Sequence, residues 1–133
     1  MLYMKIKVLL FSMLIMGLTV ACTKTPGCTD YSADNYNSDA EENDGSCQYS
    51  GDCVFWTSSQ FNYIDVTVNG YSNQISLYYP NAGVDCSSSG CASFNLPIGN
   101  YNYYAEEQGF GGVYWSGSVS IEKNLCKTIL LTP

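Results

Sequence analysis

The chain lacks histidine and arginine, and all of its 5 basic residues are lysines. Without imidazole it has no Ser-His or Cys-His nucleophile pair and no histidine metal site. Phosphate recognition needs clustered basic side chains, whereas here 12 acidic residues outnumber the lysines. The composition therefore excludes much of enzyme chemistry and predicts no nucleic-acid partner.

A catalytic pair of carboxylates is also missing from the sequence pattern. Glycoside hydrolysis needs two carboxylates across a cleft, and the spacing of the acidic residues selects no pair. Glu106 and Glu107 are adjacent, so on a strand they point to opposite faces. We expect no enzymatic activity from a chain of 133 residues, a length that allows one domain with a small appendage.

The N-terminus has the pattern of an export signal. Lys5 and Lys7 are followed by the uncharged run VLLFSMLIMGLTVA at 8–21, which is shorter than the ~20 residues of a membrane-spanning helix. Ala21 directly before Cys22 resembles the lipobox of bacterial lipoproteins. That resemblance implies a signal peptide over 1–21, acylation of Cys22, and a location in the cell envelope at the outer membrane. An ordinary secretory peptide cut nearby is the alternative.

Cysteine usage agrees with export. The chain has 7 cysteines, and 6 remain for pairing if lipid consumes Cys22. The absence of a Cys-x-x-Cys pair disfavours metal binding by these thiols. From their spacing we predict the disulfides Cys28–Cys47, Cys53–Cys126 and Cys86–Cys91.

An acidic segment follows the short tether at 22–27. Residues 28–47 read CTDYSADNYNSDAEENDGSC and hold six of the twelve acids. The segment has few apolar residues, and burying them does not offset the entropy that is lost when the backbone is ordered. A Cys28–Cys47 disulfide would contribute about 3 kcal/mol, and a calcium ion would make converging carboxylates favourable, because its ligands are hard oxygen donors.

The same run resembles a cysteine-bracketed motif of secreted and surface proteins of Gram-negative bacteria, and it is similar to the calcium-binding repeats of thrombospondin type 3. The matching residues are Cys28, Thr29, Asp30, Ala33, Asn35, Tyr36, Asn37, Ala40, Asp44, Gly45, Ser46 and Cys47. The resemblance implies calcium ligation by Asp30, Asn35, Asn37 and Asp44, with Asp39 and Glu42 as secondary ligands. The alternative is a solvated acidic spacer over 28–49, pinned by its disulfide, that holds the next domain away from the lipid.

The remainder, 50–133, has the alternation of β-strands. Ile64, Val66 and Val68 share one face before the turn signal Asn69-Gly70, and turn residues recur every eight to twelve positions. This pattern predicts an all-β sandwich of two sheets with seven short antiparallel strands, near 54–57, 63–69, 75–79, 94–96, 101–103, 113–121 and 125–131. The run LPIGNYNYYAEE at 96–107 resembles immunoglobulin-like sandwiches of the prealbumin-like and carboxypeptidase-regulatory-like kind. That resemblance implies Greek-key topology and no intrinsic activity.

A Gly-rich hairpin tip at 106–115 carries three aromatic residues. Trp115 shares its parity with the apolar positions of its strand, which leaves Phe110 and Tyr114 as contacts for a sugar or protein ligand. The alternative is that β propensity alone favours aromatic strands.

Together these patterns predict a non-catalytic, lipid-anchored envelope protein. Its sandwich would be an interaction or adhesion module on a calcium-stiffened or disulfide-pinned stalk. A carbohydrate-binding accessory lipoprotein in polysaccharide capture and a purely structural envelope protein are the alternatives.

Overall fold

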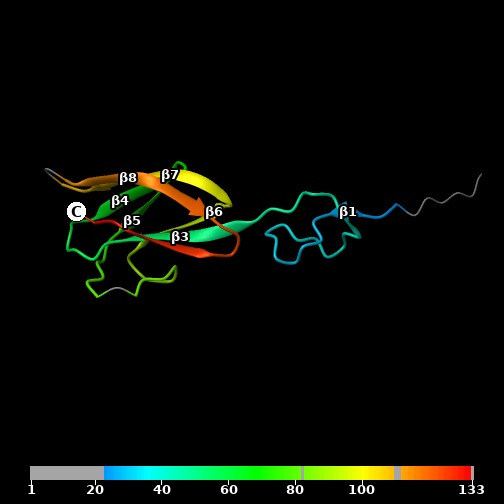
Figure 1. The fold of residues 1–133 in the computed structure, drawn as a ribbon, viewed down its shortest axis with the longest axis horizontal. Coiled ribbons are helices and arrows are strands. Elements are labelled where there is room, and N and C mark those ends of the chain that lie inside the picture. The colour runs from blue at the N-terminus through cyan, green and yellow to red at the C-terminus, as the bar shows by residue number, and fades with distance from the viewer. Residues whose placement is uncertain (1–22, 82, 110–111, 133) are drawn as a thin grey trace, which may run out of the picture.

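The computed structural model describes residues 23–81, 83–109 and 112–132, and the predicted all-β fold is confirmed for them (Figure 1). No helix in these ranges is long and apolar enough to cross a bilayer. The signal peptide, the acylation site Cys22 and the candidate ligand contact Phe110 lie outside the described residues.

Nine strands lie in three sheets within the described ranges. Two of them belong to the acidic segment and pair in parallel: β1 (Pro26–Gly27) and β2 (Glu42–Asn43). The other seven form the sandwich: β3 (Ser50–Trp56), β4 (Ile64–Val68), β5 (Tyr71–Ile75), β6 (Ala92–Pro97), β7 (Gly99–Glu107), β8 (Tyr114–Ile121) and β9 (Cys126–Leu130). Figure 1 shows the acidic segment beyond one end of the sandwich, joined to it by the chain leading into β3.

The sandwich packs a three-stranded sheet, in the order β6-β3-β9, against a four-stranded sheet, in the order β5-β4-β7-β8. The prediction of wholly antiparallel strands is wrong at one pair, because β3 and β9 run parallel with Asp52 opposite Cys126. The strand before β9 is β8, which lies in the other sheet. The chain therefore crosses from one sheet to the other before β9. Because no tight hairpin joins β9 to a neighbouring strand, β9 need not run antiparallel to that strand.

The third sandwich strand also differs from its prediction at 75–79. Asn69 and Gly70 both have positive φ, 50° and 82°, as a two-residue hairpin turn requires. This turn joins β4 directly to β5, which therefore begins at Tyr71 and ends at Ile75. Leu77, within the predicted strand, lies in the following loop and is 54% exposed.

The core lies between the two sheets and centres on Phe55. Its ring contacts Phe94 and Tyr103 edge-on, with ring centroids 5.9 and 4.8 Å away. Ile64, Val66 and Val68 face it from β4, as their alternation predicts, and all are fully buried. Edge-on aromatic packing and complete burial make this cluster the main source of the sandwich's stability.

The disulfides confirm one predicted pair and correct the other two. Cys28 is bonded to Cys47 as predicted, whereas Cys86 is bonded to Cys126. Cys53 belongs to the core cluster between the sheets, while Cys126 lies opposite the exposed Asp52 on the outer face of the three-stranded sheet. Side chains on opposite faces of one sheet do not meet, so Cys126 cannot reach Cys53. It bonds instead to Cys86, which lies in the loop between β5 and β6.

Two of the six cysteines predicted to pair are therefore free and buried, Cys53 and Cys91. Burial raises the pKa of the Cys53 thiol to about 11, with a smaller effect of Asp52, and burial also raises the pKa of Cys91. Because the thiolate is the reactive form, burial and the raised pKa both disfavour reaction of these thiols at neutral pH.

We expect iodoacetamide to leave Cys53 and Cys91 unlabelled in the native protein and to label both in guanidinium chloride without reductant. Peptide mass mapping checks the two positions separately. Label on Cys86 or Cys126 before reduction would contradict the pairing.

Candidate functional site

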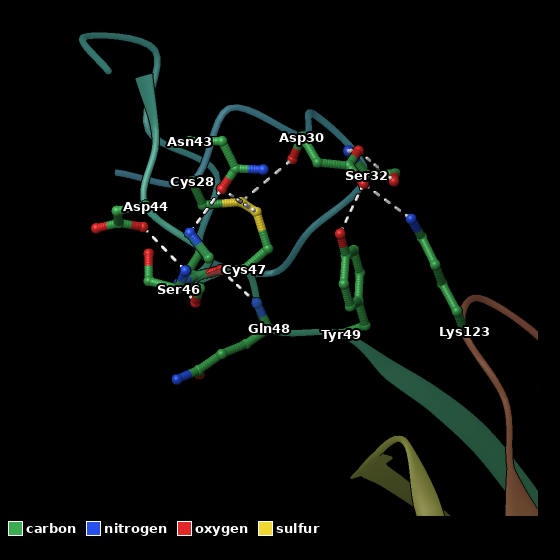
Figure 2. Close-up of a disulfide and its surroundings, with 12 residues drawn as sticks. Cys28, Asp30, Ser32, Asn43, Asp44, Ser46, Cys47, Gln48, Tyr49 and Lys123 are labelled. Carbon is green, nitrogen blue, oxygen red and sulfur yellow. Dashed lines mark hydrogen bonds and ion pairs between the residues drawn. A yellow bond between two sulfur atoms is a disulfide. The ribbon is translucent and has the colours of Figure 1, made fainter. Parts of the chain in front are cut away.

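The acidic motif, residues 28–47, is closed by its Cys28–Cys47 disulfide, whose surroundings Figure 2 shows. Cys28 and Ala33 are buried, while most of the motif is exposed. The Asn35 side chain holds the middle of the motif to its C-terminal end, because its Nδ2 donates to the Ser46 carbonyl at 2.7 Å and its Oδ1 accepts from the Gln48 amide at 2.7 Å. The motif is thus held by one covalent bond, by backbone hydrogen bonds and by side-chain hydrogen bonds to backbone.

All four side chains predicted as calcium ligands accept hydrogen bonds from the protein itself. Asn37 Oδ1 accepts from the Asp39 amide at 3.0 Å, and Asp44 Oδ1 accepts from the Ser46 amide at 2.9 Å. The Ser46 contact lowers the pKa of Asp44. The secondary candidates Asp39 and Glu42 are exposed. Within the described ranges no three acidic or cysteine side chains lie close enough together to hold a metal ion.

Asp30 lies at the boundary between the motif and the sandwich and takes four donors (Figure 2). Its Oδ1 accepts from the Ser32 amide at 2.9 Å and the Ser32 hydroxyl at 2.6 Å. Its Oδ2 accepts from the Tyr49 hydroxyl at 2.7 Å and from Lys123 Nζ at 3.0 Å. Lys123 Nζ also lies 4.0 Å from the centre of the Tyr49 ring, a cation–π contact. We name Asp30, Tyr49 and Lys123 the junction clasp.

The junction clasp disfavours a cation at this end of the motif. Hydrogen bonds from Ser32, and then from Tyr49 and Lys123, lower the pKa of the Asp30 carboxyl far below its usual range. Calcium needs six to eight oxygen ligands, and the ammonium group on Asp30 would repel it. The arrangement fits a hydrogen-bonded spacer better than a calcium site. Calcium binding itself stays a prediction.

Lys123→Ala is expected to loosen the motif without unfolding the sandwich, because exposed ion pairs contribute at most about 1 kcal/mol. Amide hydrogen exchange in residues 28–49 should accelerate in this variant. Lys127→Ala removes an exposed lysine of β9 that makes no ion pair among the described residues, and it should leave that exchange unchanged. Equal exchange in the two variants would show that the clasp does not hold the motif.

The pH dependence of the same contact follows from the lowered pKa of Asp30. A depressed carboxyl pKa gives stability that is present above the unfolded pKa of about 3.9 and is lost as pH falls through the folded value. The exchange difference between wild type and Lys123→Ala should therefore stay constant from neutral pH to about pH 5 and shrink only in strongly acidic solution.

The second candidate site is the outer face of the four-stranded sheet. Tyr104 on β7 and Tyr114 on β8 lie there with ring planes 22° apart and ring centroids 6.5 Å apart. They are 46% and 66% exposed. The Tyr104 hydroxyl donates to Glu106 Oε2 at 3.3 Å, and desolvation followed by the charge of Glu106 raises the pKa of Tyr104.

Polar side chains surround the two rings on the same face. On β4, Asp65 accepts from Gln74 Nε2 at 2.9 Å and from Gln108 Nε2 at 2.7 Å. By strand alternation and register, the outward residues of the two strands beyond it are mostly serines and asparagines. We name the following set the tyrosine–serine face: Asp65, Thr67, Ser72, Gln74, Asn100, Asn102, Tyr104, Glu106, Tyr114, Ser116, Ser118 and Ser120.

Sequence reasoning found one of the two aromatic residues on this face. Tyr114 is exposed as expected, and Trp115 turns inward against Phe61 with ring centroids 5.4 Å apart. Tyr104 was missed, although its parity is opposite to that of the core-facing Tyr103. That alternation was the signal that would have placed it outward.

A surface hollow of about 420 Å³ lies where the motif meets the sandwich. Its lining residues come from both parts: Asp34, Cys47, Gln48, Tyr49, Pro97 and Ile98. Asp34 supplies a carboxylate, which accepts from the Ser50 hydroxyl at 3.2 Å. The hollow therefore belongs to the junction between the motif and the sandwich.

The junction clasp and the tyrosine–serine face are the features from which function can be inferred. Comparison with known proteins finds no family model that matches the chain, and no curated protein or solved structure with significant similarity.

Proposed function

We propose that the protein is a non-catalytic, lipid-anchored component of the cell envelope that presents a binding surface away from the membrane. The lipobox-like Ala21-Cys22 pair supports the anchor. Cleavage there would leave three lysines against 12 acidic residues, a formal net charge of −9. Anionic headgroups repel such a chain, so the acyl chains would hold it to the membrane while the protein body stands off.

The junction clasp is the observation that carries this proposal. A slack tether would need neither a disulfide nor contacts with the domain that it carries. Here the motif is closed by Cys28–Cys47, and Asp30 reaches Lys123, which lies 93 residues later in the chain. These contacts support a spacer of fixed shape with a defined orientation relative to the sandwich.

The tyrosine–serine face supports binding over catalysis. Exposed tyrosines offer a rigid apolar surface with a polar tip, a combination that suits recognition. Asp65 and Glu106 lie opposite each other on β4 and β7, but on an open sheet surface. Carboxylate catalysis of glycoside cleavage needs the two groups across a cleft, with the substrate between them.

The disulfide-pinned form of the spacer is the better supported of the two forms, because the predicted calcium ligands are already hydrogen-bonded. We expect calcium or a chelator to leave the melting temperature of the envelope-purified protein unchanged. Calorimetric titration of calcium is the direct check. Heat of binding together with a higher melting temperature would restore the calcium-stiffened alternative.

Intact-mass analysis tests the anchor, and vesicle binding tests the face. Mass spectrometry of the envelope-purified protein should show a chain beginning at Cys22 with acyl groups added. Vesicles carrying the anchored protein should bind cells or extracellular polymer of the producing organism, and the Tyr104→Ala/Tyr114→Ala variant should bind less. A retained leader would contradict anchoring, and vesicle binding that ignores both tyrosines would contradict a role for the face.

A further inference from the structure

We propose that the ligand of the tyrosine–serine face is a neutral polysaccharide, whose sugar rings stack on Tyr104 and Tyr114 while serine and asparagine side chains bind its hydroxyl groups. This inference rests on the proposed function in one respect, namely that this face is the binding surface. It adds the chemical class of the ligand and the residues that select it.

The two tyrosines provide a platform for stacking. Their planes differ by 22° and their centroids are 6.5 Å apart, so the two rings form a nearly parallel stacked pair. Both remain substantially exposed. The adjacent residues Tyr103 and Trp115 point to the opposite face of the sheet and pack toward the core. The CH-rich face of a sugar ring can cover such apolar surface while its hydroxyl groups stay at the edge, where polar side chains reach them.

The flanking side chains match the edge of a sugar and not the centre of a protein interface. Side chains on one face recur about every 6.7 Å along a strand, and neighbouring strands lie about 4.8 Å apart. Outward positions of β7 and β8 therefore form a close lattice of hydroxyl and amide groups: Asn100, Asn102, Ser116, Ser118 and Ser120. Protein interfaces instead centre on well-packed apolar or arginine anchors, which this lattice does not offer beyond the two tyrosines.

Charge selects against acidic polymers. The face contains Asp65 and Glu106 but no lysine, because the described lysines are Lys24, Lys123 and Lys127. Uronic-acid polymers and anionic lipid would approach a negative surface on a negative protein, which is unfavourable. An open sheet face also admits a chain that continues past the site in both directions.

Affinity electrophoresis of the envelope-purified full protein in neutral detergent tests this proposal. The probes are mixed-linkage β-glucan, xylan and galactomannan, with polygalacturonate as the acidic probe and a neutral glycan array as a wider survey. We expect retardation by at least one neutral polymer and none by polygalacturonate. Tyr104→Ala and Tyr114→Ala should each weaken binding about tenfold, which corresponds to the loss of one stacking contact.

Two control variants separate stacking from general damage. Tyr104→Phe/Tyr114→Phe keeps both rings and should retain most of the binding. Tyr71→Ala removes a 63% exposed tyrosine on β5 outside the face and should bind like the wild type. Near-ultraviolet circular dichroism of each variant checks that the sandwich is folded.

The outcomes distinguish this inference from the proposed function. Neutral-glycan binding that both alanine variants weaken supports the inference. Neutral-glycan binding that neither alanine variant weakens overturns the inference, and so does a negative result with every neutral glycan. If glycans are negative while vesicles still bind cells through the two tyrosines and protease treatment of the cells abolishes that binding, the partner is a protein and only the proposed function survives.

Discussion

Phe55→Ala is expected to lower the free energy of unfolding by about 3–5 kcal/mol, because it removes the ring on which both sheets pack. The side chain is fully buried and contacts Phe94 and Tyr103 edge-on. Its loss would leave a cavity between two sheets that their strand ladders hold in place, so little collapse is expected. Small domains have a total stability of about 5–15 kcal/mol, and this single change would place the sandwich near its unfolding threshold.

Urea unfolding followed by tryptophan fluorescence measures this effect, since Trp56 and Trp115 both belong to the sandwich. Tyr71→Ala is the matched control, because it removes an exposed ring and should change stability by less than about 0.5 kcal/mol. A loss below about 1 kcal/mol for Phe55→Ala would show that the core does not centre on this ring.

Replacing Cys28 and Cys47 with serine is expected to unfold the motif while the sandwich stays folded. The motif buries Cys28 and Ala33 and little else, so the disulfide supplies most of its order. Closing a loop of this length contributes about 3 kcal/mol, which is more than any single hydrogen bond of the motif provides. Limited proteolysis should therefore cut residues 28–49 rapidly in the variant and slowly in the wild type.

The second disulfide provides the control for this experiment. Cys86→Ser/Cys126→Ser should leave residues 28–49 protected, because Cys86 and Cys126 join the loop before β6 to β9 within the sandwich. Its effect should appear as faster cleavage between β5 and β6. Equal protection of the motif in all three proteins would contradict a dominant role for Cys28–Cys47.

Local patterns predicted most of the strands and the exposed position of Tyr114, one of the two stacked tyrosines. Alternation at Ile64, Val66 and Val68 placed one face of β4 in the core, and strict parity would also have found Tyr104. The misses depended on distant contacts. Which face Cys126 occupies is set by its parallel pairing with β3, and spacing along the chain carries no information about that pairing.

The acidic motif shows the same limit. Its composition and bracketing cysteines predicted a closed, polar segment, and the Cys28–Cys47 bond is present. Its charges did not reveal that Asp30 is paired with Lys123, because 93 residues separate them. A cluster of acids predicts a cation site, and calcium binding stays a prediction, although one of these acids is paired with a lysine of the sandwich.

The position of β3 has a mechanical consequence for an anchored protein. Tension from a membrane tether would bypass most of the acidic motif through the Cys28–Cys47 bond and enter the sandwich at Ser50. There it would act along the central strand of a sheet, whose ladders to β6 and β9 run on both sides. Because those hydrogen bonds lie across the pulling direction, they would be loaded in shear and would have to break together instead of unzipping one at a time.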